Sequence, residues 1–495
     1  MTRRAGVLCP VFSIPGNQGI GDFGKKTMMM IDAIAEAGYQ IWQILPLQYT
    51  GPSHSPYQTY SSFAGDPIYI NLDRLCEMGL LKQSSITNCN KFKDRVDYDQ
   101  VRAFKEPYFK RAFRVFKNHG KEFHEEYEKF CEESFWLDDW AAYQLFHTLH
   151  DGLPWNEWDE EYVRWPKEKE VDVSDQNDQM YYYKFLQFIF YRQWQEIKNY
   201  ANEKGIKIMG DVPFYVDMDS ADVWTNPEDF LLDEKGNPKF VSGCPPDYFS
   251  ETGQRWGMPI YDFEHQKSDD FSFWCNRMRW MNYNFDIIRV DHFRAFDTYW
   301  KINSECPTAI DGEWVEAPGH HLLERIFEEC PHLELVAEDL GDIREEVFDL
   351  EDAFHIPGMD VLAFRMESKL LKKPAKENSI IYTGTHDNMT MNQLYQSFDS
   401  NKRISLRRFL KKRGYTERGF HDMICHFALD SQADIAILPI WDICGYKEEA
   451  RINYPGTISE WNWTWKLKDF KTFPDELMKT KQWIIHSQRI AKNKE

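Results

Sequence analysis

Short apolar runs alternate along the chain with stretches of helical periodicity. Residues 25–37 carry apolar side chains every three or four positions and stop at Gly38, and residues 184–204 stop in the same way at Gly205. Each stretch leads into a short, mostly apolar run that suits a buried strand. This alternation predicts a parallel α/β sheet or barrel. Eight strands are expected, at 6–14, 40–47, 206–212, 287–291, 333–338, 359–364, 380–385 and 434–440.

Eight such units predict a (β/α)8 TIM barrel, which needs only about 250 residues. The chain has 495 residues, so it has room for insertions. We expect residues 1–84 to hold the first two strands and residues 181–495 to hold the other six. Residues 85–180, charged and aromatic, are expected to form a mostly helical inserted subdomain between strands two and three. Residues 215–263, rich in Pro, Gly and aromatic side chains, are expected to form a substrate-covering loop between strands three and four.

Three of the apolar runs end in a carboxylic acid. They are FDIIRVD, LELVAE and IIYTGTHD, which end at Asp291, Glu338 and Asp387. In a barrel, the C-terminal ends of the strands open into the substrate cleft. Three acids at one rim would supply a nucleophile, a general acid/base and a third carboxylate near a developing cation, as glycosidic chemistry requires.

The residues around the acids suggest how these roles divide. Arg289 lies two positions before Asp291, on the same side of the strand, and its cation would keep the Asp291 carboxylate ionised as a nucleophile. Apolar residues precede Glu338, so its pKa should rise as a proton donor requires. The adjacent Asp339 cannot point to the same side, and it suits an N-cap of the following helix better. Taken alone, an Arg–Asp pair can equally close a strand end.

Polar side chains next to the acids could bind sugar hydroxyls. His292 follows the first acid, and His386 and Asn388 flank the third. An isolated His–Asp pair is more often structural, but three acids at equivalent positions favour a functional site. Tyr57 follows strand two, on the side of the barrel where substrate would bind.

One segment combines prolines, glycines, aromatic residues and acids. It reads GCPPDYFSETGQRWGMPIY and spans residues 243–261. It could be a rigid surface connection, or a lid that covers a bound sugar. As a lid, it would contact the sugar through Asp247, Tyr248, Glu251 and Trp256.

Composition excludes several other classes of function. Acids outnumber bases 80 to 59, for a formal charge of −21, and no basic run exceeds Lys411-Lys412-Arg413, so neither nucleic acid nor an anionic membrane is an expected partner. No run approaches the roughly 20 apolar residues of a membrane span. The ten cysteines are scattered without metal-ligand spacing, which favours reduced thiols in the cytoplasm and gives no sign of a metal or cofactor. No protein partner is indicated.

The motifs together resemble those of the amylomaltases, the 4-α-glucanotransferases of glycoside hydrolase family 77 in the α-amylase superfamily. The similar segments, from about Gly6 to Asn462, are IIRVDHFRAF, VAEDLG, YTGTHDN, GCPPDYFSETGQRWG, GDVPFYV, SPYQTYSSFAGDP and RINYPGT. Two departures are Met389, where the family often has an acid, and Ala295, where Gly is common.

The resemblance implies a barrel with insertions and assigns a role to each acid. Asp291 would be the nucleophile, Glu338 the acid/base and Asp387 the stabiliser of the transition state. Substrate would be bound by Tyr57, Asp247, Tyr248, Glu251, Trp256, Arg289, His292, His386 and Asn388. Expected donors are maltooligosaccharides and amylose, and expected acceptors are glucose or glucans, with no metal or cofactor.

Two alternatives stay open at this stage. One is an α-amylase-type retaining hydrolase on the same barrel, since the sequence does not set the ratio of transfer to hydrolysis. The other is a maltooligosaccharide-binding protein that has lost catalysis, although a binding site gains little from keeping all three acids.

Overall fold

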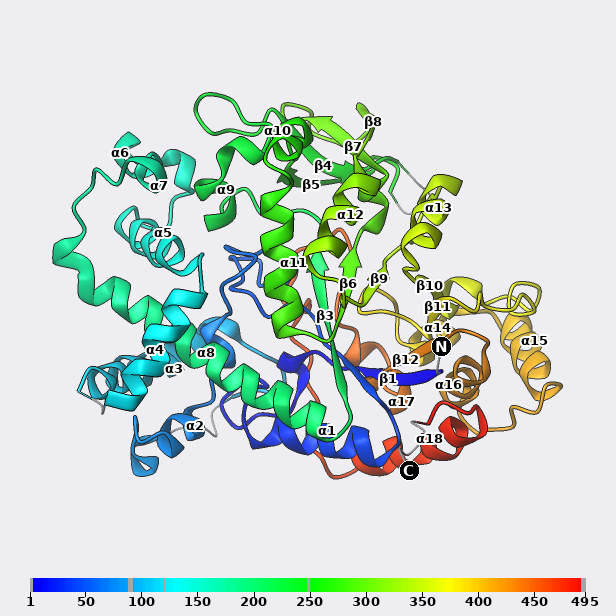
Figure 1. Ribbon diagram of the computed structural model, residues 1–495. Coiled ribbons are helices and arrows are strands. Elements are labelled where there is room, and N and C mark those ends of the chain that lie inside the picture. The colour runs from blue at the N-terminus through cyan, green and yellow to red at the C-terminus, as the bar shows by residue number, and fades with distance from the viewer. Residues whose placement is uncertain (1–2, 88–91, 119–120, 247–249, 491–495) are drawn as a thin grey trace.

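The eight expected strands all form, and they build one curled parallel sheet in the computed structural model (Figure 1). The structure describes residues 3–87, 92–118, 121–246 and 250–490. The sheet order is β10-β11-β12-β1-β2-β3-β6-β9. Its strands are β1 (Arg4–Leu8), β2 (Ile41–Gln43), β3 (Lys207–Pro213), β6 (Ile287–Asp291), β9 (Leu335–Ala337), β10 (Gly358–Val361), β11 (Ser379–Tyr382) and β12 (Ile435–Pro439).

The two end strands of this sheet meet and complete the barrel. The backbone N–H of Ala337 at the end of β9 donates a 3.0 Å hydrogen bond to the carbonyl of Pro357, just before β10. The strands are short and buried along nearly their whole length, as an enclosed parallel sheet requires. The predicted (β/α)8 barrel is therefore confirmed.

Helices surround the barrel and follow its strands in the chain. Their apolar stripes pack inward, as for Met30, Ile31 and Ile34 of α1. Apart from the helices between β2 and β3 and one short helix between β3 and β4, the helices are α1 (Lys25–Glu36), α10 (Phe263–Ser268), α11 (Ser272–Asn284), α12 (Gly319–Glu329), α13 (Glu345–Phe354), α14 (Met391–Ser397), α15 (Ser400–Lys411), α16 (Phe420–Asp430), α17 (Ile440–Ile443) and α18 (Phe473–His486). Among the described residues, no helix combines the length and apolar character needed to cross a bilayer.

The chain between β2 and β3 is helical and extends to one side of the barrel (Figure 1). The long helix α8 (Asn177–Glu203) packs against the other helices of this region through aromatic rings, and the ring centroids of Phe116 and Phe185 lie 4.8 Å apart. That residues 85–180 form an inserted subdomain of their own remains a prediction. The helices are α2 (Leu72–Glu77), α3 (Tyr98–Phe116), α4 (Lys121–Glu133), α5 (Leu137–Leu149), α6 (Glu160–Val163), α7 (Trp165–Glu168) and α8 (Asn177–Glu203).

A second, antiparallel sheet lies on the side toward which β3 and β6 point (Figure 1). Residues 215–263, expected as a loop, contain helix α9 (Ala221–Thr225) and two strands of this sheet, which pair with each other. The first of these strands also pairs with a strand that follows β6, and because that partner is distant in sequence, local patterning did not reveal the sheet. The order is β5-β4-β7-β8, with β4 (Phe240–Cys244), β5 (Gln254–Pro259), β7 (Thr298–Asn303) and β8 (Gly312–Glu316).

Candidate active site

A buried arginine joins two acids at the C-terminal end of the barrel. Arg289 lies opposite Asp211 in the register of β6 and β3, and Asp291 follows two positions later on the same face. The Nη1 atom of Arg289 donates to Asp211 Oδ1 and Oδ2 at 2.7 and 2.8 Å, and to Asp291 Oδ1 at 2.9 Å. Asp211 is buried, whereas the Asp291 side chain is 33% exposed. The strand therefore delivers one carboxylate from the core into an accessible position.

The positive charge of Arg289 and the carboxylates of Asp211 and Asp291 attract one another. Burial opposes the charge of Arg289, but the carboxylates of Asp211 and Asp291 outweigh it and raise the pKa of Arg289 well above its usual value. A permanently charged guanidinium in contact with Asp291 stabilises its carboxylate form, which is the nucleophilic form.

Glu338 lies beside Asp291, one residue beyond the end of β9. The register pairs Val290 with Ala337, and Glu338 continues the ladder by donating its N–H to the carbonyl of Val290 at 3.0 Å. Its Oε2 accepts a 2.9 Å hydrogen bond from the backbone N–H of His292. Burial, together with the negative charge of Asp291, raises the pKa of Glu338 well above its usual value. Glu338 is therefore suited to hold a proton at neutral pH.

Asp387 lies in the loop after β11 and is held from two sides. Its Oδ1 accepts a 2.6 Å hydrogen bond from Asn453 Nδ2, and its Oδ2 lies 3.5 Å from His386 Nε2. The His386 ring is buried and stacks on Tyr57, with ring centroids 5.2 Å apart. Asp387 itself is 45% exposed, so it can reach a bound ligand.

Tyr57 connects the loop after β2 to the charged group in the barrel. Its hydroxyl donates a 2.8 Å hydrogen bond to Asp211 Oδ2. Burial raises the pKa of Tyr57, and the charges of Asp211, Asp291 and Asp387 raise it further, because all three acids lie near this hydroxyl. The contacts of Tyr57 thus show that the ends of β3, β6 and β11 converge at one place.

His292 occupies a left-handed backbone conformation, with φ of 55°, directly after Asp291. Such a conformation is uncommon for a residue with a side chain, and it is found most often at functional sites. Burial lowers the pKa of His292 to about 4, so the ring is neutral near pH 7. Its Nε2 is buried without a hydrogen-bond partner in the described part of the chain, and the Trp256 ring lies edge-on to it, 4.8 Å away between centroids.

Most of the residues predicted for the site contact one another, and the other four are Asn388, Glu251, Asp247 and Tyr248. Asn388 uses its side-chain oxygen within its own loop, accepting a 2.8 Å hydrogen bond from the Thr385 N–H. Glu251 is exposed in the connection between β4 and β5. Asp247 and Tyr248 lie outside the described residues. The residues that converge are Tyr57, Trp256, Arg289, Asp291, His292, Glu338, His386 and Asp387.

Two residues that support the site, Asp211 and Asn453, were not predicted from the sequence, and a third, Asp339, has a different role from the one expected. Asp211 binds Arg289, and Asn453 binds Asp387. The sequence signal for Asp211 was the presence of an acid within the buried run of β3. The expectation that Asp339 caps the next helix was wrong. Its carboxylate accepts the N–H of Met359 at 2.6 Å, where β9 meets β10, and α13 instead begins after Arg344. Strand β10 lies beside the end of β9, so its backbone binds the Asp339 carboxylate, which is then not available to cap α13.

Comparisons with known proteins agree with this geometry. A family profile described as 4-alpha-glucanotransferase matches residues 9–472. The 4-alpha-glucanotransferase of Thermus thermophilus is 40% identical over 488 residues, covering 96% of this chain and 97% of the relative. The enzyme of the same name from a Synechocystis strain is also 40% identical, over 487 residues, covering 96% of this chain and 95% of the relative.

A solved structure extends the agreement to three dimensions. The amylomaltase from Streptococcus agalactiae, in complex with acarbose, superposes with a TM-score of 0.92 at 30% identity. The superposition covers 99% of this chain and 100% of that one. A (β/α)8 barrel with a carboxylate pair at its C-terminal rim defines an enzyme of glycosidic-bond chemistry. Within that class, this chain belongs to the 4-alpha-glucanotransferase family.

Proposed function

We propose that this enzyme transfers a segment of an α-1,4-glucan to the 4-hydroxyl of an acceptor glucose or glucan, by a retaining double displacement. One observation supports the mechanism above all. Asp291 contacts a permanently charged arginine, while the neighbouring Glu338 is buried with a raised pKa. A carboxylate beside a fixed positive charge, next to an acid whose pKa is raised, is what a nucleophile and its proton donor require.

In the first half-reaction, Asp291 attacks the anomeric carbon of the donor sugar. Glu338 gives its proton to the glycosidic oxygen as the bond from carbon to oxygen breaks, and the reducing-end piece leaves. The product is a glycosyl ester on Asp291. Retaining enzymes of this kind place the two carboxyl groups about 5 Å apart, which neighbouring strands such as β6 and β9 allow.

In the second half-reaction, Glu338 is ionised and accepts the proton of the acceptor's 4-hydroxyl. That oxygen attacks the anomeric carbon, the ester to Asp291 breaks, and a longer glucan forms. Asp387, held by Asn453, would stabilise the positive charge that develops on the sugar in both steps. Because one product leaves before the second substrate reacts, the kinetics should be ping-pong.

The remaining residues of the site would bind the sugar and limit access of water. The neutral His292 ring can exchange a hydrogen bond with a sugar hydroxyl through Nε2, and His386 and Tyr57 flank Asp387. Trp256 on β5 offers an aromatic face beside His292. We assign maltooligosaccharides and amylose as donors and glucose or glucans as acceptors. The described cysteines other than Cys244 are free thiols, which supports a cytoplasmic location.

Maltotriose as the sole substrate tests the proposal. Transfer should yield glucose together with oligosaccharides longer than three units, which chromatography resolves. Products no longer than the substrate would instead indicate a retaining hydrolase. Binding of maltooligosaccharides in calorimetry, without any turnover, would indicate a protein that only binds them.

A further inference from the structure

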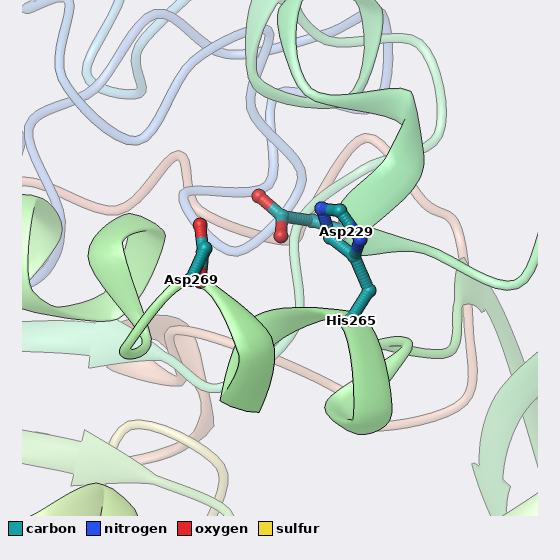
Figure 2. Close-up of side chains that lie close together, drawn as sticks. All are labelled: Asp229, His265 and Asp269. Carbon is teal, nitrogen blue, oxygen red and sulfur yellow. The ribbon is translucent and has the colours of Figure 1, made fainter.

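A second cluster of ionisable side chains, which includes none of the three acids of the active site, lies in the chain between β3 and β6 (Figure 2). It consists of Asp229, at the end of the 3-10 turn η7 (Pro227–Asp229), and of His265 and Asp269, from α10 and its C-terminal cap. One ligand atom from each residue lies within 4.8 Å of the other two. Across the described ranges, this is the one group of histidine, cysteine and acid side chains with such spacing.

The side chain of Asp229 provides an independent sign that this cluster binds a ligand. Its side chain is buried, with only 3% of the residue exposed, yet Oδ1 has no hydrogen-bond partner among the described residues. Figure 2 shows the Asp229 carboxylate directed toward Asp269, with the His265 ring beside it. A buried carboxylate oxygen without a donor or a cation is destabilising in general, so Asp229 would gain from a bound cation.

The surroundings increase this cost. Burial, and then the negative charges of Asp269, Glu228 and Asp262, raise the pKa of Asp229 to about 7. Of the neighbouring acids, Asp262 caps α10 by accepting the His265 N–H at 3.0 Å, and Asp269 accepts the Ser272 hydroxyl at 2.6 Å. The ligand atoms of Asp229, His265 and Asp269 lie within 4.8 Å of one another. The acids around Asp229 therefore make its surroundings negative, which favours a cation.

We infer that Asp229, His265 and Asp269 form a binding site for a divalent transition-metal ion, with Zn²⁺ as the best-matched ion. One imidazole nitrogen and two carboxylate oxygens suit Zn²⁺, with water completing a tetrahedron, whereas Mg²⁺ and Ca²⁺ prefer oxygen ligands alone. Ligands about 2.1 Å from the metal lie roughly 3.4 Å from one another, so the side chains would move inward by about 1 Å. Asp269 is exposed, and it would exchange its hydrogen bond with Ser272 for the metal in making this movement.

The ion would fasten α10 to η7. Strand β5, which carries Trp256, leads into α10 after only three residues, Ile260–Asp262. A metal at this point would thus fix the base of the segment that places Trp256 beside His292. The role is structural, and it does not depend on the proposed reaction.

Metal titration of the full chain, after treatment with a chelator, tests the site. Calorimetry with Zn²⁺ should show one ion per chain, bound at least tenfold more tightly than Mg²⁺, and Zn²⁺ should raise the melting temperature by a few degrees. His265→Gln and Asp269→Asn should each weaken Zn²⁺ binding at least tenfold. Glu264→Gln, which removes an exposed acid of the same helix, should bind as the wild type does.

Asp229→Asn separates a metal ligand from a merely structural acid. Without metal, this variant should be as stable as the wild type or more so, because a buried uncompensated acid has been removed. With Zn²⁺, it should lose the rise in melting temperature. Absence of stoichiometric binding, binding unchanged in all three cluster variants, or Co²⁺ spectra with thiolate charge-transfer bands from the cysteines would each overturn the inference.

Discussion

The backbone N–H of His292 donates a 2.9 Å hydrogen bond to the carboxylate of Glu338. Because His292 is bonded covalently to Asp291, this hydrogen bond sets the spacing between the two acids of the proposed reaction. The left-handed turn at His292 aims the N–H at Glu338. The relative position of the two carboxyl groups is therefore set by the backbone, which changes less readily than side-chain rotamers.

Asp291→Asn should leave the fold intact and reduce transfer from maltotriose at least about a thousandfold, because an amide cannot form the glycosyl ester. Mass spectrometry of the protein, quenched during turnover of a fluorinated donor, should show a glycosyl adduct in the wild type and none in the variant. An adduct on the variant would exclude Asp291 as the nucleophile.

Glu338→Gln should lower transfer from maltotriose by about 10²–10⁴-fold, since the proton donor is lost. With maltosyl fluoride, whose leaving group needs no proton, formation of the intermediate should be much less affected. The wild type should lose activity as pH rises through the raised pKa of Glu338, and the variant should lack this decline. Equal losses on both substrates would argue against a role in proton transfer.

Asp211→Asn should destabilise the protein by about 3–5 kcal/mol in urea unfolding, because it leaves the buried Arg289 guanidinium short of a counter-charge. A suitable control is Glu328→Gln, which removes an exposed ion pair with Arg325 and should cost less than about 1 kcal/mol. Similar unfolding free energies for the two variants would show that Asp211 does not hold Arg289 in the way described.

Tyr57 makes two separable contributions, a hydrogen bond to Asp211 and a stack on His386. Tyr57→Phe removes only the hydrogen bond to a charged group and should cost about 1.5–3 kcal/mol of stability. Tyr57→Ala should also raise KM for maltotriose, because the rings beside Asp387 lose their packing. If the two variants have the same KM, the stack does not contribute to substrate binding.

Glu351 should make stability depend on pH. It is 4% exposed, and burial, with Asp339 nearby, raises its pKa to about 8 in the folded protein. A folded-state pKa above the unfolded value of roughly 4.3 adds stability at low pH that is lost as pH rises toward 8. The melting temperature should therefore fall between pH 5 and pH 8, and it should fall less in Glu351→Gln. Asp349→Asn, an exposed acid of the same helix, should follow the wild type.

Much of the fold could be predicted from local patterning. Strands buried on both faces show as apolar runs, so all eight barrel strands were expected near their observed positions. The antiparallel sheet escaped prediction, because the pairing that joins its two hairpins, β4 with β7, spans a long stretch of chain. Asp339 shows the same limit, since its partner Met359 lies on the strand that closes the barrel.

The sequence by itself determined the barrel, the three strand-end acids and the family, because these depend on residue type, periodicity and spacing along the chain. Only the tertiary structure decided how the acids are supported. Asp211 reaches Arg289 across β3 and β6, and Asn453 reaches Asp387 from a distant loop. It also placed Asp229 beside His265 and Asp269. Burial and neighbouring charge set protonation and ligand affinity, and both arise only when distant segments pack together.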